Sequence, residues 1–404
     1  MGLFVPAYVS SWTTYKKRMI RKMKNVGIIT FHKSLNYGSA LQAWALSKFL
    51  SEREYNVQII DYTPVNYSVN YGLFYAPKNL RLLTYDVLHL LWLPFLLRRN
   101  KDFIAFRQNN LPLSNKQFDH ISGIKAFAAQ QDIMISGSDQ IWNPTAKDFD
   151  MNYLLQGVQD VRKISYAASM GQSDFSNVKN KDEIRKCLLD YDYISVREET
   201  GAKKVKNLIG DKKDVSVVLD PTLLLDKKKY EEITSARTVQ QPYIFFYSVR
   251  FNEAALIAAK IFSQELKIPV YTLMSTNGTP RYLKYQNIIK LSKGNAGPSG
   301  FLELIKNAEY VITDSFHGVA FSIIFEKNFL SVNRIENGKP RDDERITNLL
   351  KQLNLMDRYI FPDDIKSFDV AATIDYSTIQ VLKEKIRAES VAFLDKALEH
   401  ESEE

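Results

Sequence analysis

Residues 26–50 read VGIITFHKSLNYGSALQAWALSKFL, and the rest of the fold can be worked out from this unit. Residues 26–31 form a short apolar run that is typical of a buried parallel strand. A polar turn follows at residues 32–38. Beyond the turn, apolar side chains recur at helical spacing: Ala40, Leu41, Ala43, Trp44, Leu46, Phe49 and Leu50. The pattern predicts a strand followed by a helix, which is the repeating unit of a parallel sheet.

The same alternation continues along the chain in two series. The first predicts strands at residues 57–61, 132–136, 164–167, 193–196 and 215–219, with helices at 182–190 and 199–209. A charged, non-periodic segment at residues 226–242 separates it from the second. The second predicts strands at residues 243–248, 270–273, 310–313 and 329–332, with helices at 253–266, 299–307, 319–325 and 377–398. We therefore predict an α/β protein of two Rossmann-like domains, whose parallel sheets face a central cleft at the carboxyl ends of their strands.

Composition and charge narrow the class of protein. The 404 residues are enough for two domains, and 45% apolar with 25% charged residues excludes a disordered chain. Cys187 is the single cysteine, which excludes an intrachain disulfide and a zinc site of several cysteines, and favours a cytoplasmic protein. The net charge of +8 is spread along the chain without a nucleic-acid-binding signature, so we expect no nucleic-acid partner. No apolar window reaches about 18 residues, so no membrane-spanning helix is expected.

Two segments leave alternatives open. Residues 1–24 carry a basic run after a short apolar stretch, the reverse of a secretory signal. This arm is either disordered or misassigned, with translation starting at Met23, or it lies on anionic lipid headgroups. Residues 80–99, LRLLTYDVLHLLWLPFLLRR, form either a pair of core helices interrupted at Pro94 or an interfacial helix with Arg98 and Arg99 on headgroups.

Polar side chains collect after the predicted strands, where ligands bind in such folds. Residues 32–42, HKSLNYGSALQ, open a helix whose N–H groups could face an anion, although Asn36 and Gly38 could equally form a simple turn. The segment lacks GxGxxG, so a dinucleotide fingerprint is absent. Residues 136–144, SGSDQIWNP, offer a carboxylate, two amides and an indole, a set that suits a sugar ring: Asp139, Gln140, Trp142 and Asn143. The alternative is a turn in which Asp139 caps the backbone.

Two further clusters carry groups suited to anions. Arg197, in SVREET at residues 195–200, could bind a carboxylate or phosphate, or instead pair with Glu198, Glu199 or a more distant acid. Residues 313–318, TDSFHG, bring a set of polar groups against a helix N-terminus: Thr313, Asp314, Ser315 and His317. Adjacent residues in one turn cannot adopt the geometry of a hydrolase triad. The five histidines lack the spacing of metal ligands, so no metal site is expected.

Six segments, in this order, resemble the polysaccharide pyruvyltransferase family over residues 25–350: NYGSALQAWAL, ISGSDQIWNP, SYAASMG, ISVREETGAKKV, VVLDPTLLL and YVITDSFHGVAFSIIF. The resemblance implies a fold like that of GT-B glycosyltransferases. It implies an acceptor-side domain at residues 25–238, and a donor-side domain at residues 239–404 whose final helix crosses back.

The resemblance also implies transfer of the enolpyruvyl unit of phosphoenolpyruvate to two hydroxyls of a sugar, giving a cyclic ketal and phosphate. The acceptor would belong to a surface-glycan precursor, carried on a polyprenyl diphosphate at the inner face of the membrane. No cofactor or metal is expected. His317 would lie beside the donor, Arg197 would hold one of its anionic groups, and Thr313 and Ser315 would line the donor site.

A further donor-site cation is expected downstream of the histidine, and its candidates are Lys339, Arg341 and Arg345. We favour Arg345; the alternatives are a solvated loop for Lys339 and Arg341, and an ion pair with Asp342 or Glu344 for Arg345. Asp139 would be the base that orients the acceptor hydroxyl. The remaining acceptor contacts are expected from Asn36, Tyr37, Gly38, Gln140 and Trp142.

Two other functions fit the same fold. A GT-B glycosyltransferase would bind a nucleotide sugar in place of phosphoenolpyruvate. A non-catalytic assembly protein would bind the saccharide without turnover and would be indifferent to His317→Ala.

Overall fold

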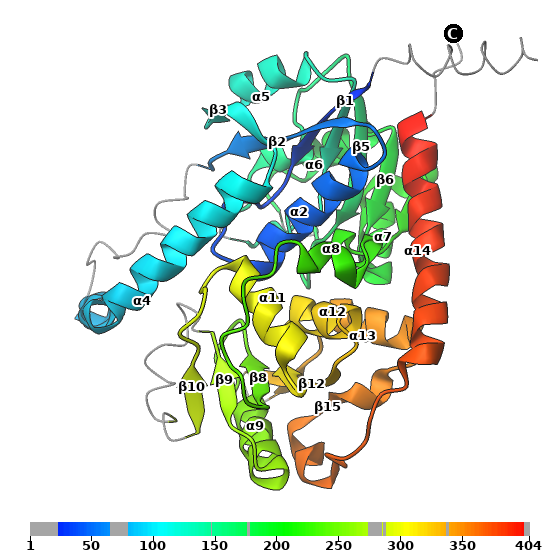
Figure 1. Ribbon diagram of the computed structural model, residues 1–404. Helices are drawn as coiled ribbons and strands as arrows, with labels where there is room; N and C mark the ends of the chain where they lie inside the picture. Colours follow the sequence, from blue (N-terminus) through cyan, green and yellow to red (C-terminus); the bar gives the residue numbers. More distant parts are fainter. Residues whose placement is uncertain are drawn as a thin grey trace, which may run out of the picture.

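The computed structural model describes residues 23–64, 80–146, 148–175, 178–273, 285, 288–336 and 339–399, without the side chains of 80–92, 339 and 340. Its core is two sheets of parallel strands (Figure 1). The seven-stranded sheet has the order β3-β2-β1-β4-β5-β6-β7, and the six-stranded sheet has the order β10-β9-β8-β11-β12-β15. We call each sheet with its helices a lobe. The predicted two parallel sheets with intervening helices are confirmed.

The strands of the first sheet are β1 (Asn25–Ile29), β2 (Asn56–Tyr62), β3 (Leu113–Phe118), β4 (Ile133–Ser136), β5 (Arg162–Ala168), β6 (Tyr193–Val196) and β7 (Val215–Val217). Those of the second are β8 (Ile244–Tyr247), β9 (Val270–Thr272), β10 (Ile289–Leu291), β11 (Tyr310–Thr313), β12 (Asn328–Val332) and β15 (Tyr359–Ile360). A separate antiparallel hairpin pairs β13 (Arg334–Glu336) with β14 (Lys339–Arg341). The boundary expected between residues 238 and 239 falls in the connection from β7 to β8 and stays a prediction.

The helices that matter most for the site are α2 (Tyr37–Ser51), α7 (Glu199–Ile209), α8 (Lys227–Glu231), α11 (Pro298–Asn307), α12 (Phe316–Ile324) and α13 (Glu344–Gln352). All but α7 lie between the sheets, and α7 packs against the opposite face of the first sheet. The others are α4 (Leu80–Asn110), α5 (Ile121–Ala128), α6 (Lys181–Leu189), α9 (Glu253–Leu266) and α14 (Tyr376–Glu399). The helix predicted at 319–325 begins three residues earlier, because Ser315 caps it and accepts a bond from Gly318 N at 3.4 Å.

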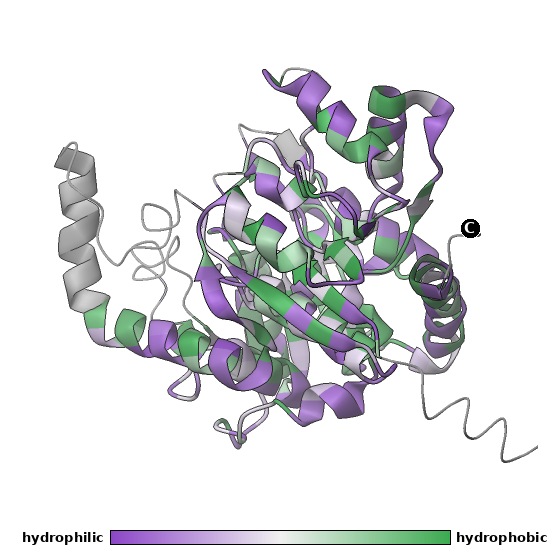
Figure 2. Cartoon of the chain, turned by 90° about the horizontal axis from the view of Figure 1, so that it is seen from above, coloured by the Kyte–Doolittle hydropathy of each residue, from purple (hydrophilic) through white to green (hydrophobic). Residues whose placement is uncertain are grey.

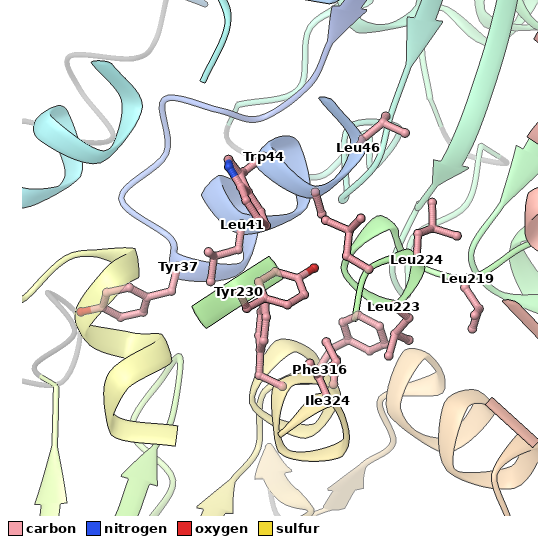
Figure 3. Packing of buried hydrophobic residues seen from close by; sticks show 14 of the residues in the cluster. Tyr37, Leu41, Trp44, Leu46, Leu219, Leu223, Leu224, Tyr230, Phe316 and Ile324 are labelled. Carbon is pink, nitrogen blue, oxygen red and sulfur yellow. The ribbon is translucent and has the colours of Figure 1, made fainter. Parts of the chain in front are cut away.

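The two lobes share one apolar core. It contains side chains from both sheets, such as Ile28 and Val311, and it is continuous through α2, α8 and α12 (Figure 3). Trp44 on α2 lies 5.3 Å from Tyr230 on α8, and the Tyr230 ring lies 5.0 Å from Phe321 on α12. We call this trio the apolar seam. Because α2 lies between the lobes, it is buried on nearly every side, which explains why its sequence is apolar all round.

Helix α4 corrects the prediction for residues 80–99. It runs unbroken from Leu80 to Asn110 with Pro94 inside, so the expected pair of helices is wrong. A proline removes one backbone hydrogen bond, and the helix beyond it is held by the buried side chains of Phe103 and Phe106. Figures 1 and 2 show α4 reaching out from the sheets, with apolar and polar residues intermixed along it.

The expected contact of Arg98 and Arg99 with headgroups is also wrong. Arg98 donates to the carbonyl oxygens of Lys293 and Ser292 at 3.0 and 3.2 Å, and the buried Arg99 donates to Leu35 O. Both guanidinium groups therefore bind the protein itself. Among the helices of the described residues, none has the length and apolar content needed to cross a membrane. Residues 1–22 of the basic arm lie outside the described residues.

Helix α14 follows the second lobe in sequence and runs along the first (Figure 1). Ser390 Oγ accepts from Leu219 N at 2.9 Å, and Arg387 Nε donates to Leu224 O at 2.8 Å. At its far end, Leu398 O accepts from Lys24 Nζ and Arg162 Nη1, each at 3.2 Å. The helix thus ties both lobes together on the side away from α4.

Candidate functional site

Four polar segments meet where the carboxyl ends of the two sheets approach each other. Asp139 follows β4, Arg197 follows β6, and His317 follows β11 in the first turn of α12. Arg345 joins them from the first turn of α13. The sequence placed Asp139, Arg197 and His317 at separate strand ends and Arg345 in a charged segment downstream. The structure brings them into one buried cluster, because parallel strands end at the same edge of a sheet.

Asp220 is the centre of this cluster. One carboxylate oxygen, Oδ2, lies 2.5 Å from Arg197 Nη1 and 3.7 Å from His317 Nε2. The other, Oδ1, accepts from Thr222 N at 3.0 Å and from Thr222 Oγ1 at 2.7 Å. Burial alone would raise the pKa of Asp220, but its contacts with His317 and Arg197 outweigh burial and lower it. Asp220 thus links an arginine of the first lobe to a histidine of the second.

The guanidinium of Arg197 is held on three sides. Besides Asp220, its Nε donates to Glu198 Oε1 at 3.3 Å, and its plane lies over the Phe316 ring at 4.6 Å. Burial acts to lower the pKa of Arg197, but Asp220 and Glu198 outweigh it and raise that pKa. The remaining nitrogen, Nη2, is buried and has no hydrogen-bond partner among the described residues. Such a donor costs free energy unless a ligand meets it.

His317 is similarly incomplete. Its Nε2 is buried without a hydrogen-bond partner among the described residues, since 3.7 Å to Asp220 is too long for a hydrogen bond. Thr313 Oγ1 accepts from Ser315 N at 3.1 Å and so shapes the turn before it. The ring of His317 also lies against Gly38, because a Cβ atom at position 38 would be only 1.9 Å from His317 Nδ1. Only glycine allows α2 to approach the histidine this closely.

The polar residues predicted for the acceptor side make hydrogen bonds within the protein. Asn36 caps α2, accepting from Gly38 N at 3.0 Å, so Asn36 and Gly38 lie at the cluster but their polar groups serve the helix end. Asp139, at a positive φ of 72°, accepts from Gln140 N at 2.8 Å and from Ser39 Oγ. Gln140 Oε1 accepts from Asn143 Nδ2 at 2.9 Å. The carboxylate of Asp139 therefore both caps its turn and reaches across to α2.

Two predicted acceptor contacts are wrong. Trp142 is completely buried in the apolar cluster on the face of the first sheet that is turned away from the shared core. Its ring lies 5.6 Å from the Tyr191 ring, so the indole cannot stack on a sugar. Tyr37 is also buried; its ring lies parallel to Phe301 at 5.0 Å, and its hydroxyl donates to Ala296 O at 3.2 Å. Both aromatic side chains contribute packing, which from sequence looks the same as an aromatic platform.

The candidate cations differ in what they bind. Arg345 Nε donates to Asp343 Oδ1 at 2.8 Å, so the alternative of an ion pair holds, but with Asp343 in place of Asp342 or Glu344. Asp343 caps α13, which brings it next to Arg345. The acids around Arg345 raise its pKa against burial, Asp343 most strongly and then Glu198 and Asp139. Arg341 binds Gln172 Oε1 at 2.6 Å and Glu336. Lys339 lies in β14, and its side chain is outside the described residues.

Sequence reasoning missed two members of the cluster, Asp220 and Asp343, and named Glu198 only as an alternative ion-pair partner of Arg197, a pairing that the structure contains. Asp220 ends the apolar run VSVVL and precedes Pro221, so a polar residue at a strand end was a usable signal. Glu198 is almost completely buried, and its Oε1 accepts from Ser169 Oγ at 2.6 Å. Burial raises the pKa of Glu198, and the nearby Arg197 offsets this only in part. Nothing in the letters SVREET distinguishes this buried acid from the exposed Glu199.

Two open depressions lie away from the cluster. One, of about 850 Å³, is at the amino-terminal edge of the first sheet and includes Lys24, Asp132 and Arg162. The other, of about 770 Å³, lies beside β9 and β10 and includes Tyr271 and Lys290. We assign function to the closed polar cluster, because open α/β sheets bind ligands at the carboxyl ends of their strands. Within the described residues no group of three or more histidine, cysteine or acidic side chains could hold a metal ion.

Comparisons with known proteins agree with this fold. No curated protein matches the sequence significantly. Among solved structures, UDP-GlcNAc 2-epimerase from Methanocaldococcus jannaschii superposes with a TM-score of 0.53 at 12% identity, covering 91% of this chain and 100% of that one. UDP-GlcNAc 2-epimerase from Neisseria meningitidis, bound to UDP-GlcNAc, gives a TM-score of 0.44 at 9% identity, covering 92% and 100%. The predicted GT-B-like fold is confirmed. The model of the polysaccharide pyruvyl transferase family matches residues 36–336.

Proposed function

Because this chain belongs to the polysaccharide pyruvyl transferase family, we propose that it transfers the enolpyruvyl unit of phosphoenolpyruvate to a saccharide. The product would be a cyclic pyruvate ketal, with release of phosphate. One observation carries the proposal: the side chains of Arg197 and His317, from different lobes, flank the carboxylate of Asp220, and neither Arg197 Nη2 nor His317 Nε2 has a hydrogen-bond partner among the described residues.

The donor's chemistry suits these two atoms. Phosphoenolpyruvate carries a phosphate and a carboxylate, and a guanidinium binds either through charge-assisted hydrogen bonds. The N-terminus of α12 adds its partial positive charge beside His317. Arg345 supplies a second guanidinium, which Asp343 orients. With this positive charge in place, the proposal needs neither a metal ion nor an organic cofactor.

The reaction can be written as four steps. His317 delivers a proton to the methylene carbon of the donor, which becomes a methyl group and leaves an oxocarbenium-like centre. A sugar hydroxyl attacks that centre and loses its proton to Asp139. The phosphate leaves with its bridging oxygen, assisted by Arg197. A second sugar hydroxyl then attacks the same carbon and closes the ketal. The two hydroxyls lose two protons in all; the methyl group gains one, and the released phosphate gains the other.

The acceptor is proposed to be a surface-glycan precursor on a polyprenyl diphosphate, met at the inner face of the membrane. The net charge of +8 and the exposed Leu97 and Ile104 on α4 support a peripheral contact with anionic lipid. We expect the protein to sediment with washed membranes at low salt and to leave them at high salt. A protein that stays in the supernatant at low salt would contradict the peripheral contact.

The first experiment is calorimetric binding of phosphoenolpyruvate to the purified protein, beside uridine and guanosine diphosphates. We expect a saturable signal for phosphoenolpyruvate that weakens in His317→Ala, and turnover lower by about 10²–10⁴-fold, the usual worth of a proton-transfer group. His120→Ala is the matched control, because His120 caps α5 at the surface and should leave the signal unchanged.

Binding of a nucleoside diphosphate without a phosphoenolpyruvate signal would instead identify a glycosyltransferase, and the role given to His317 would be withdrawn. Binding of saccharide alone, indifferent to His317→Ala, would identify a non-catalytic assembly protein.

A further inference from the structure

The cluster holds more carboxylates than guanidinium groups. Counted over the described residues, Arg197 and Arg345 face four acids: Asp139, Glu198, Asp220 and Asp343. The N-termini of α2 and α12 contribute about half a positive charge each. The carboxylates therefore outnumber the guanidinium groups, and the site has no excess of positive charge before a ligand enters, whether or not His317 carries a proton.

The proposed donor makes this imbalance larger. At pH 7.5 its carboxylate and its phosphate, whose second proton leaves near a pH of about 6, together add close to three negative charges. Like charges in a buried site disfavour each other's ionisation. The site must therefore lower its own negative charge as the donor binds, and it can do so by taking up a proton.

Glu198 is the acid whose contacts best allow the uptake of a proton. Asp343 has two hydrogen bonds from Arg345, and Asp220 has Arg197 together with both groups of Thr222. Asp139 receives Ser39 Oγ and the backbone N–H of Gln140. Glu198 shares Arg197 with Asp220 at the longer distance, 3.3 Å against 2.5 Å, and only 3% of its side chain is exposed. Of the three acids bonded to a guanidinium, Glu198 has the longest contact, and it is almost completely buried.

Among the described residues, the positive charges that act on Glu198 are Arg197, in the segment after β6, and Arg345 of α13. Ser169 Oγ, in the residue after β5, donates to it at 2.6 Å. Its Oε2 lies against Gly201 of α7, 3.2 Å from the position a Cβ would take there. A donor anion that engages Arg197 Nη2 therefore competes for the charge that keeps Glu198 ionised.

We propose that Glu198 takes up one proton from solvent when the anionic donor binds beside Arg197, and returns it to solvent when phosphate leaves. The carboxylate becomes a carboxylic acid that still accepts from Ser169 and Arg197 through Oε1. Glu198 is thus a positioning residue that acts through Arg197, and it makes donor binding depend on pH. The inference rests on phosphoenolpyruvate being the donor.

The test measures how many protons the protein takes up when the donor binds. Calorimetry of phosphoenolpyruvate at pH 7.5 is run in HEPES and in Tris, whose different ionisation heats reveal the number of protons taken up. We expect the wild-type protein to take up about one proton more than Glu198→Gln, and its donor KM to rise by up to about tenfold per pH unit above neutrality. Because the amide mimics the protonated acid, Glu198→Gln should bind the donor more tightly than wild type at pH 8.5.

A merely structural role for Glu198 would weaken donor binding at every pH, and that result would overturn the inference. Equal proton uptake by the wild type and Glu198→Gln would also overturn it. Absence of proton uptake by the wild type would do the same, and that measurement does not depend on the folding of a variant. Glu303→Gln is the matched control, since Glu303 is another buried acid, bonded to Thr238 away from the site. Absence of any phosphoenolpyruvate signal in the wild type would instead be a failure of the proposed function.

Discussion

Helix α2 meets the second lobe in two neighbouring places that differ in kind. Along its length it packs into the apolar seam, where Trp44, Tyr230 and Phe321 fill the space between the lobes (Figure 3). At its N-terminus it meets His317, in a cluster with buried polar atoms that lack hydrogen-bond partners among the described residues. Unsatisfied buried polar groups are costly, whereas close-packed rings are stabilising. The comparison teaches that the seam supplies the stability that lets the cluster remain incomplete.

The largest effect is expected from Phe321→Ala in the seam. The change leaves a cavity beside Tyr230 and Phe301 and should lower the free energy of unfolding by about 3–5 kcal/mol. Urea denaturation followed by tryptophan fluorescence measures the loss. Because the core is shared, we expect both lobes to unfold in one transition.

Val381→Ala is the control for this measurement, since Val381 is 71% exposed on α14 and should change stability by less than about 0.5 kcal/mol. Two separate transitions in Phe321→Ala, with one lobe as stable as in the wild type, would contradict the role given to the seam.

The second-largest effect is expected from Gly38→Ala, where the N-terminus of α2 meets His317. The added methyl group overlaps His317 Nδ1, so the ring must move, while alanine is a better helix former than glycine. We expect turnover of phosphoenolpyruvate to fall by about 10²-fold, the usual cost of displacing a catalytic group by about 1 Å. The unfolding free energy, measured in urea, should change little. Full turnover in Gly38→Ala would show that the close approach has no part in catalysis.

The smallest effect is the one that acid is expected to have through Asp343 of the cluster. The neighbouring Arg345 lowers the pKa of Asp343 against the effect of burial. A carboxyl group with a lowered pKa stabilises the fold above its ordinary value near pH 4, and that contribution is lost as the pH falls below it. We expect a loss of about 1 kcal/mol from this partly exposed pair between pH 4.5 and 2.5.

Asp343→Asn tests the source of that loss. Asparagine keeps the cap of α13 but carries no charge, so unfolding free energies across the same pH range should fall less steeply than in the wild type. An identical pH dependence in the two proteins would place the acid sensitivity elsewhere.

The sequence predicted the strands and helices of the molecule better than the contacts between side chains. Strands such as β1 and β11 are short apolar runs, and their periodicity is a local property. β3 escaped prediction because only Ser114 among its residues is buried, so it lacks that pattern. The polar residues after the strands were found because strand ends are marked in the sequence, but the pairing of Asp220 with Arg197 and His317 depends on tertiary structure. For the same reason the burial of Trp142 and Tyr37 could not be foreseen.

Helix α14 has a consequence for how the chain folds during synthesis. Phe393 packs beside Tyr166 and Tyr193 of the first sheet, and Ser390 binds the backbone of Leu219. A ribosome therefore releases the whole first sheet long before it makes the helix that covers β5 and β6 on one of its faces. Until then, this part of the face is exposed in the nascent chain and is open to chaperones. The two lobes should reach their native state together near the end of translation, rather than one after the other.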